Sequence, residues 1–143
     1  MDERSESNLT HVHPDLAKVI RAAAQAPQPF EVIYGIRTLA AEAQAVASGH
    51  SQTMHSRHLP DPKYGNVAMA VDIGCLTNGV IDFTVSDALG GIYNIAAKQI
   101  LAAASNLGVK IQWGGQAIGA WADNVPSHFR DWGHFQLDPS AYP

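Results

Sequence analysis

A single aspartate, Asp72, stands inside the short apolar stretch VAMAVDIG of residues 67–74. The stretch is rich in β-branched residues, which favours a strand, and side chains alternate between the two faces of a strand. Val71 and Ile73 then share a core face, whereas Asp72 shares the opposite face with very small residues. A partly buried carboxylate needs a partner, because burial without one is costly. The fold must therefore bring a partner to this face, and a zinc ion is one candidate.

The rest of the chain divides into short helical and extended patterns separated by proline, glycine and asparagine. Apolar residues recur at helical spacing in several segments, and short runs of β-branched or aromatic residues indicate strands. Residues 1–10 are polar and are expected to form a loose lead-in. The expected helices cover residues 14–26, 38–48 and 87–106, and the expected strands cover 30–36, 67–74, 80–83, 109–113 and 134–137.

This order of elements favours an α+β domain with a small, mostly antiparallel sheet, helices packed on one face and a zinc site on the other. A chain of 143 residues has the size of one ordinary domain, so we expect a single domain over residues 1–143. The longest expected helix would carry an apolar face made of Ile92, Ile95, Ala96, Ile100 and Leu101.

A second cluster of reactive side chains lies at the last expected strand, in the segment DWGH of residues 131–134. Alternation places His134 and Gln136 on one face of that strand and the apolar residues beside them on the other. Asp131 and His134 are three positions apart, so a straight strand would put them on opposite faces. We therefore expect the Trp132-Gly133 step to bend the chain if both serve one site, and glycine suits such a bend.

Together with His58, the two clusters offer a ligand set that suits zinc. Two histidines and one carboxylate, here His58, His134 and Asp72, commonly hold catalytic zinc and leave a fourth position for water. The metal lowers the pKa of that water to about 7, and a second carboxylate, Asp131, could take its proton. The helical HExxH pattern of many zinc proteases does not occur in the sequence. The spacing by itself thus supports a zinc hydrolase only in general terms.

Charge and cysteine content argue against several other classes. The formal net charge of −4 disfavours a sequence-independent nucleic-acid binder, which needs a basic face. The sequence has one cysteine, Cys75, so an intramolecular disulfide is ruled out. Cys75 lies an even number of positions from Val71 and Ile73, so it shares their face of the strand, and this parity predicts a small buried core residue. No run of about 18 apolar residues and no apolar N-terminal stretch occurs, so neither a membrane span nor a signal peptide is expected. Nothing suggests a dimer seam, and a monomer is expected.

Four short motifs occur in order along most of the chain: Tyr34-Gly35-Ile36-Arg37-Thr38, Ser56-Arg57-His58, Ala70-Val71-Asp72 and Asp131-Trp132-Gly133-His134. Together they resemble the zinc peptidases that include the D-alanyl-D-alanine carboxypeptidases and dipeptidases and the L-alanyl-D-glutamate endopeptidases of bacteriophages. The fold implied is of the hedgehog/D-Ala-D-Ala peptidase type. In this chain Asp72 follows His58 by a longer stretch than is usual in the family, so extra residues would loop out beside the site.

The resemblance implies a role for each motif. His58, Asp72 and His134 would bind Zn²⁺, and Asp131 would act as the general base. Arg37 would stabilise the carbonyl oxygen of the substrate as it becomes an oxyanion. Ser56 would contact the substrate, with turn capping as the alternative.

The activity implied is hydrolysis of an amide bond in the peptidoglycan stem peptide, between L-alanine and D-glutamate, by an enzyme of the phage endolysin type. One alternative is a D,D-carboxypeptidase that trims terminal D-alanine, and another is a non-catalytic, zinc-containing wall-binding module. No nucleic acid and no membrane insertion are expected. The enzyme would stay in the host cytoplasm until a separate pore protein opens the inner membrane, and would then act on the cell wall in the periplasm.

Several residues keep two interpretations. Trp113 could line a substrate groove, but core packing explains it equally well. His55 could compete with His58 as a ligand. The remaining histidines are expected to be exposed to solvent: His11, His13, His50 and His128.

Overall fold

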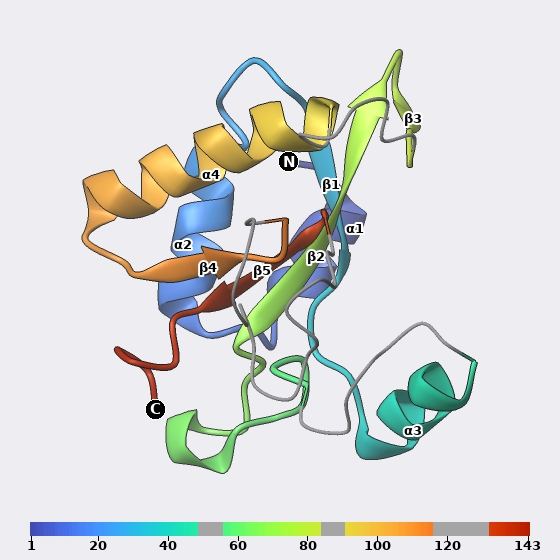
Figure 1. Ribbon diagram of the computed structural model, residues 1–143, viewed down its shortest axis with the longest axis vertical. Helices are drawn as coiled ribbons and strands as arrows, with labels where there is room; N and C mark the ends of the chain where they lie inside the picture. The colour runs from blue at the N-terminus through green and yellow to red at the C-terminus, as the bar shows by residue number, and fades with distance from the viewer. Residues whose placement is uncertain (49–55, 84–90, 116–131) are drawn as a thin grey trace.

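The computed structural model describes residues 1–48, 56–83, 91–115 and 132–143, which form a small antiparallel sheet with helices around it (Figure 1). Each expected helix and strand has a counterpart there, and the α+β fold class is confirmed. The helices are α1 (Glu3–Leu9), α2 (Pro14–Ala23), α3 (Leu39–Ala47), α4 (Ile92–Leu107) and the 3-10 helix η1 (Pro62–Tyr64), and the strands are β1 (Phe30–Tyr34), β2 (Ala70–Thr77), β3 (Val80–Ile81), β4 (Ile111–Trp113) and β5 (His134–Leu137).

All described strand pairs are antiparallel, in the order β1-β2-β5-β4, and β3 pairs with β2 beside this path. The β2–β3 hairpin turns through Asn78 and Gly79, whose φ angles are +53° and +79°. Positive φ at both central residues suits a type I′ turn, which asparagine and glycine tolerate. β2 begins at Ala70 rather than at Val67, because the residues before it form only isolated bridges with other segments.

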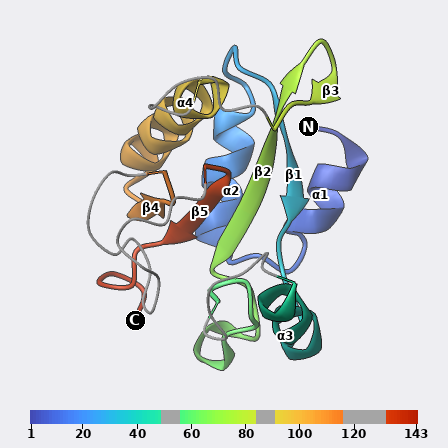
Figure 2. The same cartoon turned by 45° about the vertical axis from the view of Figure 1, so that its right-hand side comes forward.

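The hydrophobic core lies between one face of the sheet and the helices α2 and α4, which pack against each other on that side (Figures 1 and 2). On β2 the residues Val71, Ile73 and Cys75 are all buried in this core, as their shared parity predicted. On α2 the apolar residues at helical spacing are buried too: Leu16, Val19, Ile20 and Ala23.

Helix α4 turns a slightly different face to the core than its sequence predicted. Ile95, placed on the apolar face, is 52% exposed, so that prediction is wrong. The buried residues follow helical spacing from Tyr93, whose hydroxyl donates a hydrogen bond to the carbonyl of Asp82 at 2.7 Å. They are Tyr93, Ala96, Ala97, Ile100 and Ala104. Among the described residues, no helix is both long and apolar enough to cross a membrane.

The N-terminal segment is not the loose lead-in that its polar composition suggested, because Glu3–Leu9 form α1. Asp2 caps this helix by accepting a hydrogen bond from the backbone N–H of Ser5 at 2.9 Å. The hydroxyl of Ser5 accepts from the N–H of Val32 at 2.9 Å, and the amide of Asn8 donates to the carbonyl of Val32 at 2.8 Å. Helix α1 therefore lies along the edge of β1 that faces away from β2 (Figure 2).

Helix α3 lies at one end of the sheet, apart from α2 and α4 (Figures 1 and 2). Thr38 is its N-cap, and its hydroxyl accepts a hydrogen bond from the N–H of Ala41 at 3.1 Å. The expected start of α4 at residues 87–90 lies outside the described residues. The single domain over residues 1–143 stays a prediction.

Candidate metal centre

The pairing of β2 with β5 places Asp72 directly opposite His134. Side chains of directly opposed residues lie on the same face of a sheet and touch. That face is opposite to the one on which Val71 and Phe135 are buried in the core. The Nδ1 atom of His134 lies 3.1 Å from Oδ1 of Asp72. The predicted division of the two strands into a core face and a site face is thereby confirmed.

His58 reaches the same carboxylate from the segment that precedes β2. The N–H of Arg37 donates a hydrogen bond to the carbonyl of His58 at 2.8 Å, which fixes the backbone. The ring is buried, and its Nε2 atom lies 3.2 Å from Oδ1 of Asp72. Ligand atoms of His58, Asp72 and His134 all lie within 4.8 Å of one another. The structure thus brings together the three residues that the sequence singled out.

The hydrogen bonds behind the two histidines show why this cluster fits a cation. The Nδ1 atom of His58 lies 2.7 Å from the carbonyl oxygen of Gly35, and Nε2 of His134 lies 2.8 Å from Oε1 of Gln136. Both partners are acceptors, so each ring donates there and, when neutral, carries a lone pair on its other nitrogen. Those lone pairs, on Nε2 of His58 and Nδ1 of His134, face the same oxygen of Asp72.

Three electron-pair donors at such short distances are stable only with a positive charge among them. The buried Nε2 of His58 has no hydrogen-bond partner among the described residues, which fits a metal ligand better than a packed core histidine. Metal-binding histidines characteristically donate their other ring N–H to a carbonyl or carboxylate. The donor set therefore fits a metal ion.

The electrostatics of Asp72 point the same way. Burial by itself would raise the pKa of the Asp72 carboxyl. When the neighbouring His58 and His134 rings carry positive charge, they outweigh that effect and hold the pKa of the Asp72 carboxyl well below its usual range. Asp72 is therefore ionised at neutral pH and supplies the negative charge that a divalent cation requires.

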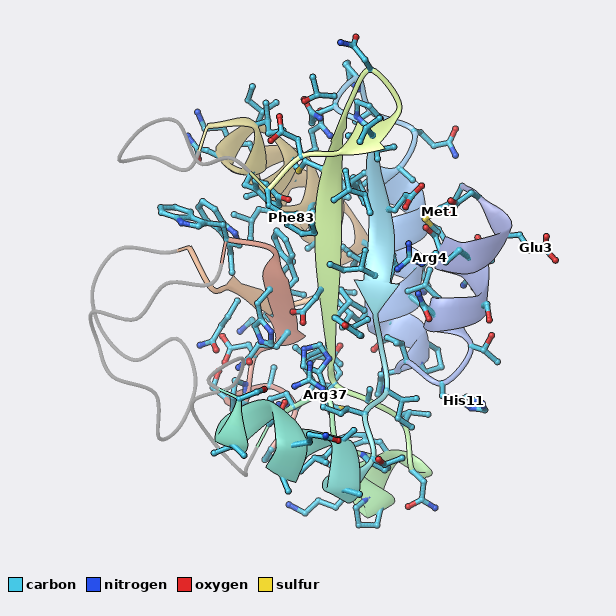
Figure 3. The ribbon with its side chains drawn as sticks, turned by 90° about the vertical axis from the view of Figure 1, so that its right-hand side faces the viewer. Met1, Glu3, Arg4, His11, Arg37 and Phe83 are labelled. Atoms are coloured by element: carbon cyan, nitrogen blue, oxygen red, sulfur yellow. The ribbon has the colours of Figure 1, made fainter. Side chains whose placement is uncertain are left out.

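Arg37 lies beside this cluster. One guanidinium nitrogen is 4.0 Å from Oδ2 of Asp72, and the guanidinium carbon is 5.5 Å from the centroid of the Tyr34 ring. Figure 3 shows Arg37 near the end of the sheet at which α3 lies. Arg37 thus places a cation next to the carboxylate, and its action on a substrate oxygen stays a prediction.

The Trp132-Gly133 step forms a turn before β5, at the place where a bend was expected. Gly133 does not have a positive φ, and its small size serves a close approach instead. A Cβ atom there would lie 2.5 Å from the carbonyl oxygen of Ile73, and the N–H of Ile73 donates to the carbonyl of Gly133 at 2.9 Å. Asp131 lies outside the described residues, so its place relative to His134 stays a prediction.

The two expected substrate contacts have structural partners of their own. The Ser56 hydroxyl accepts a hydrogen bond from the N–H of His58 at 3.1 Å, which is the turn-capping alternative. Trp113 is 7% exposed, lies against Phe135 and donates its indole N–H to the carbonyl of Trp132 at 2.8 Å. Both side chains thus have packing or capping roles, and substrate contact by either stays a prediction.

The other histidines divide into three cases. His11 is exposed, as expected. His13 is half-buried rather than exposed, because its Nδ1 atom caps α2 and its ring packs edge-on against Tyr64 and Tyr142. Three further histidines lie outside the described residues: His50, His55 and His128.

Two partners of the cluster were missed by sequence reasoning. The Gly35 carbonyl, which accepts from His58, belongs to the backbone and leaves no mark in the residue pattern. Gln112 accepts a hydrogen bond from the amide of Gln136 at 3.1 Å, and the two residues are directly paired between β4 and β5. Strand alternation could have found Gln112, had the register of β4 against β5 been known.

Comparisons with known proteins agree on one family. The family described as phage L-alanyl-D-glutamate peptidase matches residues 1–138. The L-alanyl-D-glutamate peptidase of Escherichia phage T5 is 32% identical over 140 residues, which cover 94% of this chain and 95% of the phage protein. The crystal structure of the Serratia marcescens L-Ala D-Glu endopeptidase ChiX matches with a TM-score of 0.77 and 34% identity, over 100% of this chain and 92% of that one. The chain therefore belongs to the phage L-alanyl-D-glutamate peptidase family.

Proposed function

We propose that this protein is a zinc-dependent endolysin that hydrolyses the bond between L-alanine and D-glutamate in the peptidoglycan stem peptide. One observation carries the proposal: the ligand atoms of His58, Asp72 and His134 converge within 4.8 Å in a member of this peptidase family. The T5 and Serratia relatives are both named for that bond. This favours endopeptidase activity over the trimming of terminal D-alanine.

Zinc is the ion that the donor set suits best. Two imidazoles with one carboxylate are typical zinc ligands, whereas magnesium and calcium prefer sites made of oxygen atoms. When bound, zinc supplies Lewis-acid polarisation of a water molecule and of the scissile carbonyl. His58, Asp72 and His134 would hold the ion.

The chain's own residues supply the remaining chemistry. Asp131 is the proposed general base, which takes a proton from the attacking water and passes it to the leaving amine. It precedes His134 by three positions, across the turn at Trp132-Gly133. Arg37, 4.0 Å from Asp72, is proposed to donate hydrogen bonds to the substrate carbonyl oxygen as negative charge develops on it. Passage to the wall through a separate pore protein stays a prediction.

Two substitutions separate metal binding from proton transfer. We expect Asp131→Ala to keep one zinc ion per chain but to lose about 10²- to 10⁴-fold in the rate of lysis of purified peptidoglycan. His134→Ala is expected to lose both, because a ligand is removed. Zinc content by atomic absorption and turbidity loss of a peptidoglycan suspension measure the two properties. A fully active Asp131→Ala variant would rule out this base.

Mass spectrometry of the digested muropeptides identifies the bond. Endopeptidase cleavage leaves L-alanine on the glycan and releases a peptide that begins with D-glutamate. Trimming at the other end would release free D-alanine instead, and that result would replace the proposed specificity. The same digest with a chelator is expected to be inactive, and addition of zinc should restore cleavage.

A further inference from the structure

Behind His134 lies a pair of glutamines that the zinc mechanism proposed above does not use. Gln136 is 1% exposed and shares the site face of β5 with His134. Its Oε1 atom lies 2.8 Å from Nε2 of His134, and its Nε2 atom donates to Oε1 of Gln112 at 3.1 Å. An amide buried this completely keeps its orientation only if its hydrogen bonds agree with one another.

The orientation of this amide decides which nitrogen of His134 is available to a metal. With the amide oxygen toward the ring, Nε2 of His134 keeps its proton and Nδ1 presents a lone pair toward Asp72. A flipped amide would present its NH₂ group, so that Nε2 would have to accept and the proton would move to Nδ1. A protonated Nδ1 donates to Asp72 and is closed to a metal.

Gln112 favours the orientation in which the amide oxygen of Gln136 faces the ring of His134. Its Oε1 atom accepts from the NH₂ group of Gln136, and a flipped Gln136 would place two amide oxygens against each other. The contact comes from direct pairing of Gln112 with Gln136 in the β4–β5 ladder, so the sheet register places the two amides against each other. The hydrogen bonds therefore connect Gln112 through Gln136 to the ring of His134.

We propose that Gln136 is a positioning residue that holds His134 in the metal-binding tautomer, with Gln112 fixing the orientation of the Gln136 amide. This inference rests on the proposed zinc site and adds the source of its preorganisation. Neither glutamine touches the metal or the substrate in this scheme. Both act through the ring of His134.

The test compares zinc affinity in four proteins by competition with a chromophoric chelator: wild type, Gln136→Met, Gln136→Glu and Gln112→Met. Methionine preserves the volume but cannot accept from the ring, so Q136M is expected to bind zinc about 10- to 100-fold more weakly. Glutamate only accepts, so Q136E should bind at least as tightly as wild type. Q112M permits the flip and should fall between wild type and Q136M.

A spectroscopic measurement separates positioning from packing. In the zinc-saturated wild type, the imidazole N–H proton of His134 should give a downfield NMR signal, because it is hydrogen-bonded to an amide oxygen. The signal should move upfield or vanish in Q136M and return in Q136E. The double variant Gln112→Met/Gln136→Glu should recover wild-type zinc affinity, since a carboxylate has no flipped state. It also provides the test if Q136M does not fold.

The outcomes distinguish this inference from the proposed function. A wild-type protein that fails to bind one zinc ion overturns the metal site, and the inference with it. A wild-type protein that binds zinc while Q136M binds equally tightly overturns the inference alone. Equal weakening by Q136M and Q136E also overturns it, because the amide would then contribute shape rather than an acceptor. Thermal unfolding of the metal-free variants serves as the folding control.

Discussion

The two faces of the β2–β5 pair are made from alternate residues of the same two strands, yet different forces hold them. On the core face, Val71, Ile73, Phe135 and Leu137 are at most 2% exposed and are stabilised by apolar packing, which has little directional preference. On the site face, the short contacts that join Asp72 to His58 and His134 are directional polar ones, with defined donor and acceptor atoms.

Because different forces hold the two faces, we expect folding and metal binding to be separable although both depend on one strand register. A slip of β5 by one residue would exchange the faces, burying His134 in the core and exposing Phe135 at the site. The core face therefore selects the register, and the register in turn places Asp72 opposite His134. Substitutions on the core face should change mainly the stability of the fold, and substitutions on the site face should change mainly zinc affinity.

The largest effect on stability is expected at Phe135. Phe135→Ala should lower the free energy of unfolding of the metal-free protein by about 3–5 kcal/mol, because it removes a fully buried ring and leaves a cavity. The neighbouring His134→Ala is the matched control on the other face and should cost far less in the absence of zinc. Urea unfolding with chelator present measures both. Equal losses at the two positions would show that the two faces contribute equally to the stability of the metal-free fold.

Gly133 should affect both faces at once, with an intermediate effect. A Cβ atom at this position would lie 2.5 Å from the carbonyl oxygen of Ile73, which is backbone and has little freedom to yield. Gly133→Ala is expected to cost about 1–3 kcal/mol by overpacking and to weaken zinc binding, since it displaces the start of β5 at His134. Unfolding and zinc titration of the same variant test the coupling. Loss of stability with unchanged zinc affinity would show that His134 is positioned independently of the turn.

Features set by strand alternation could be predicted from the sequence, whereas features set by pairing between strands could not. The parity of Asp72, Cys75 and Val71 was sufficient to assign their faces, because a strand has a fixed period of two. The sequence motifs also identified His58 and Arg37 as candidate site residues. By contrast, the contact between Gln112 and Gln136 depends on the register of two strands, which a single strand pattern does not contain.

The N-terminus shows a second reason for failure. Helix α1 has the sequence ERSESNL and buries only Ser5 and Leu9, so it lacks an apolar stripe that periodicity could detect. Side-chain hydrogen bonds from Ser5 and Asn8 to the backbone of β1 hold it instead. Ile95 on α4 was misplaced because the buried face of that helix includes Tyr93, Ala96 and Ala97 and leaves Ile95 outside it.

The smallest effect is expected at Asp2, which lies on neither face of the β2–β5 pair. Asp2→Ala removes the N-cap of α1 and should lower the free energy of unfolding by about 1 kcal/mol without changing zinc affinity. Asp2→Asn keeps a capping oxygen and is the control. Any loss of zinc affinity in Asp2→Ala would show that α1, through β1, helps to set the site.

The same cap gives a pH dependence with a defined sign. Hydrogen bonds from the hydroxyl and the backbone N–H of Ser5 lower the pKa of the Asp2 carboxyl in the folded protein. A carboxyl with a lowered folded-state pKa contributes stability that is present above its unfolded-state pKa of about 4 and is lost as the pH falls through the folded-state value. The side-chain amide of the Asp2→Asn control does not titrate, so the stability of wild type relative to this control should fall between about pH 6 and pH 3. Urea unfolding of the metal-free proteins at the two pH values measures this difference, and an identical pH dependence would show that Asp2 does not cap the helix in solution.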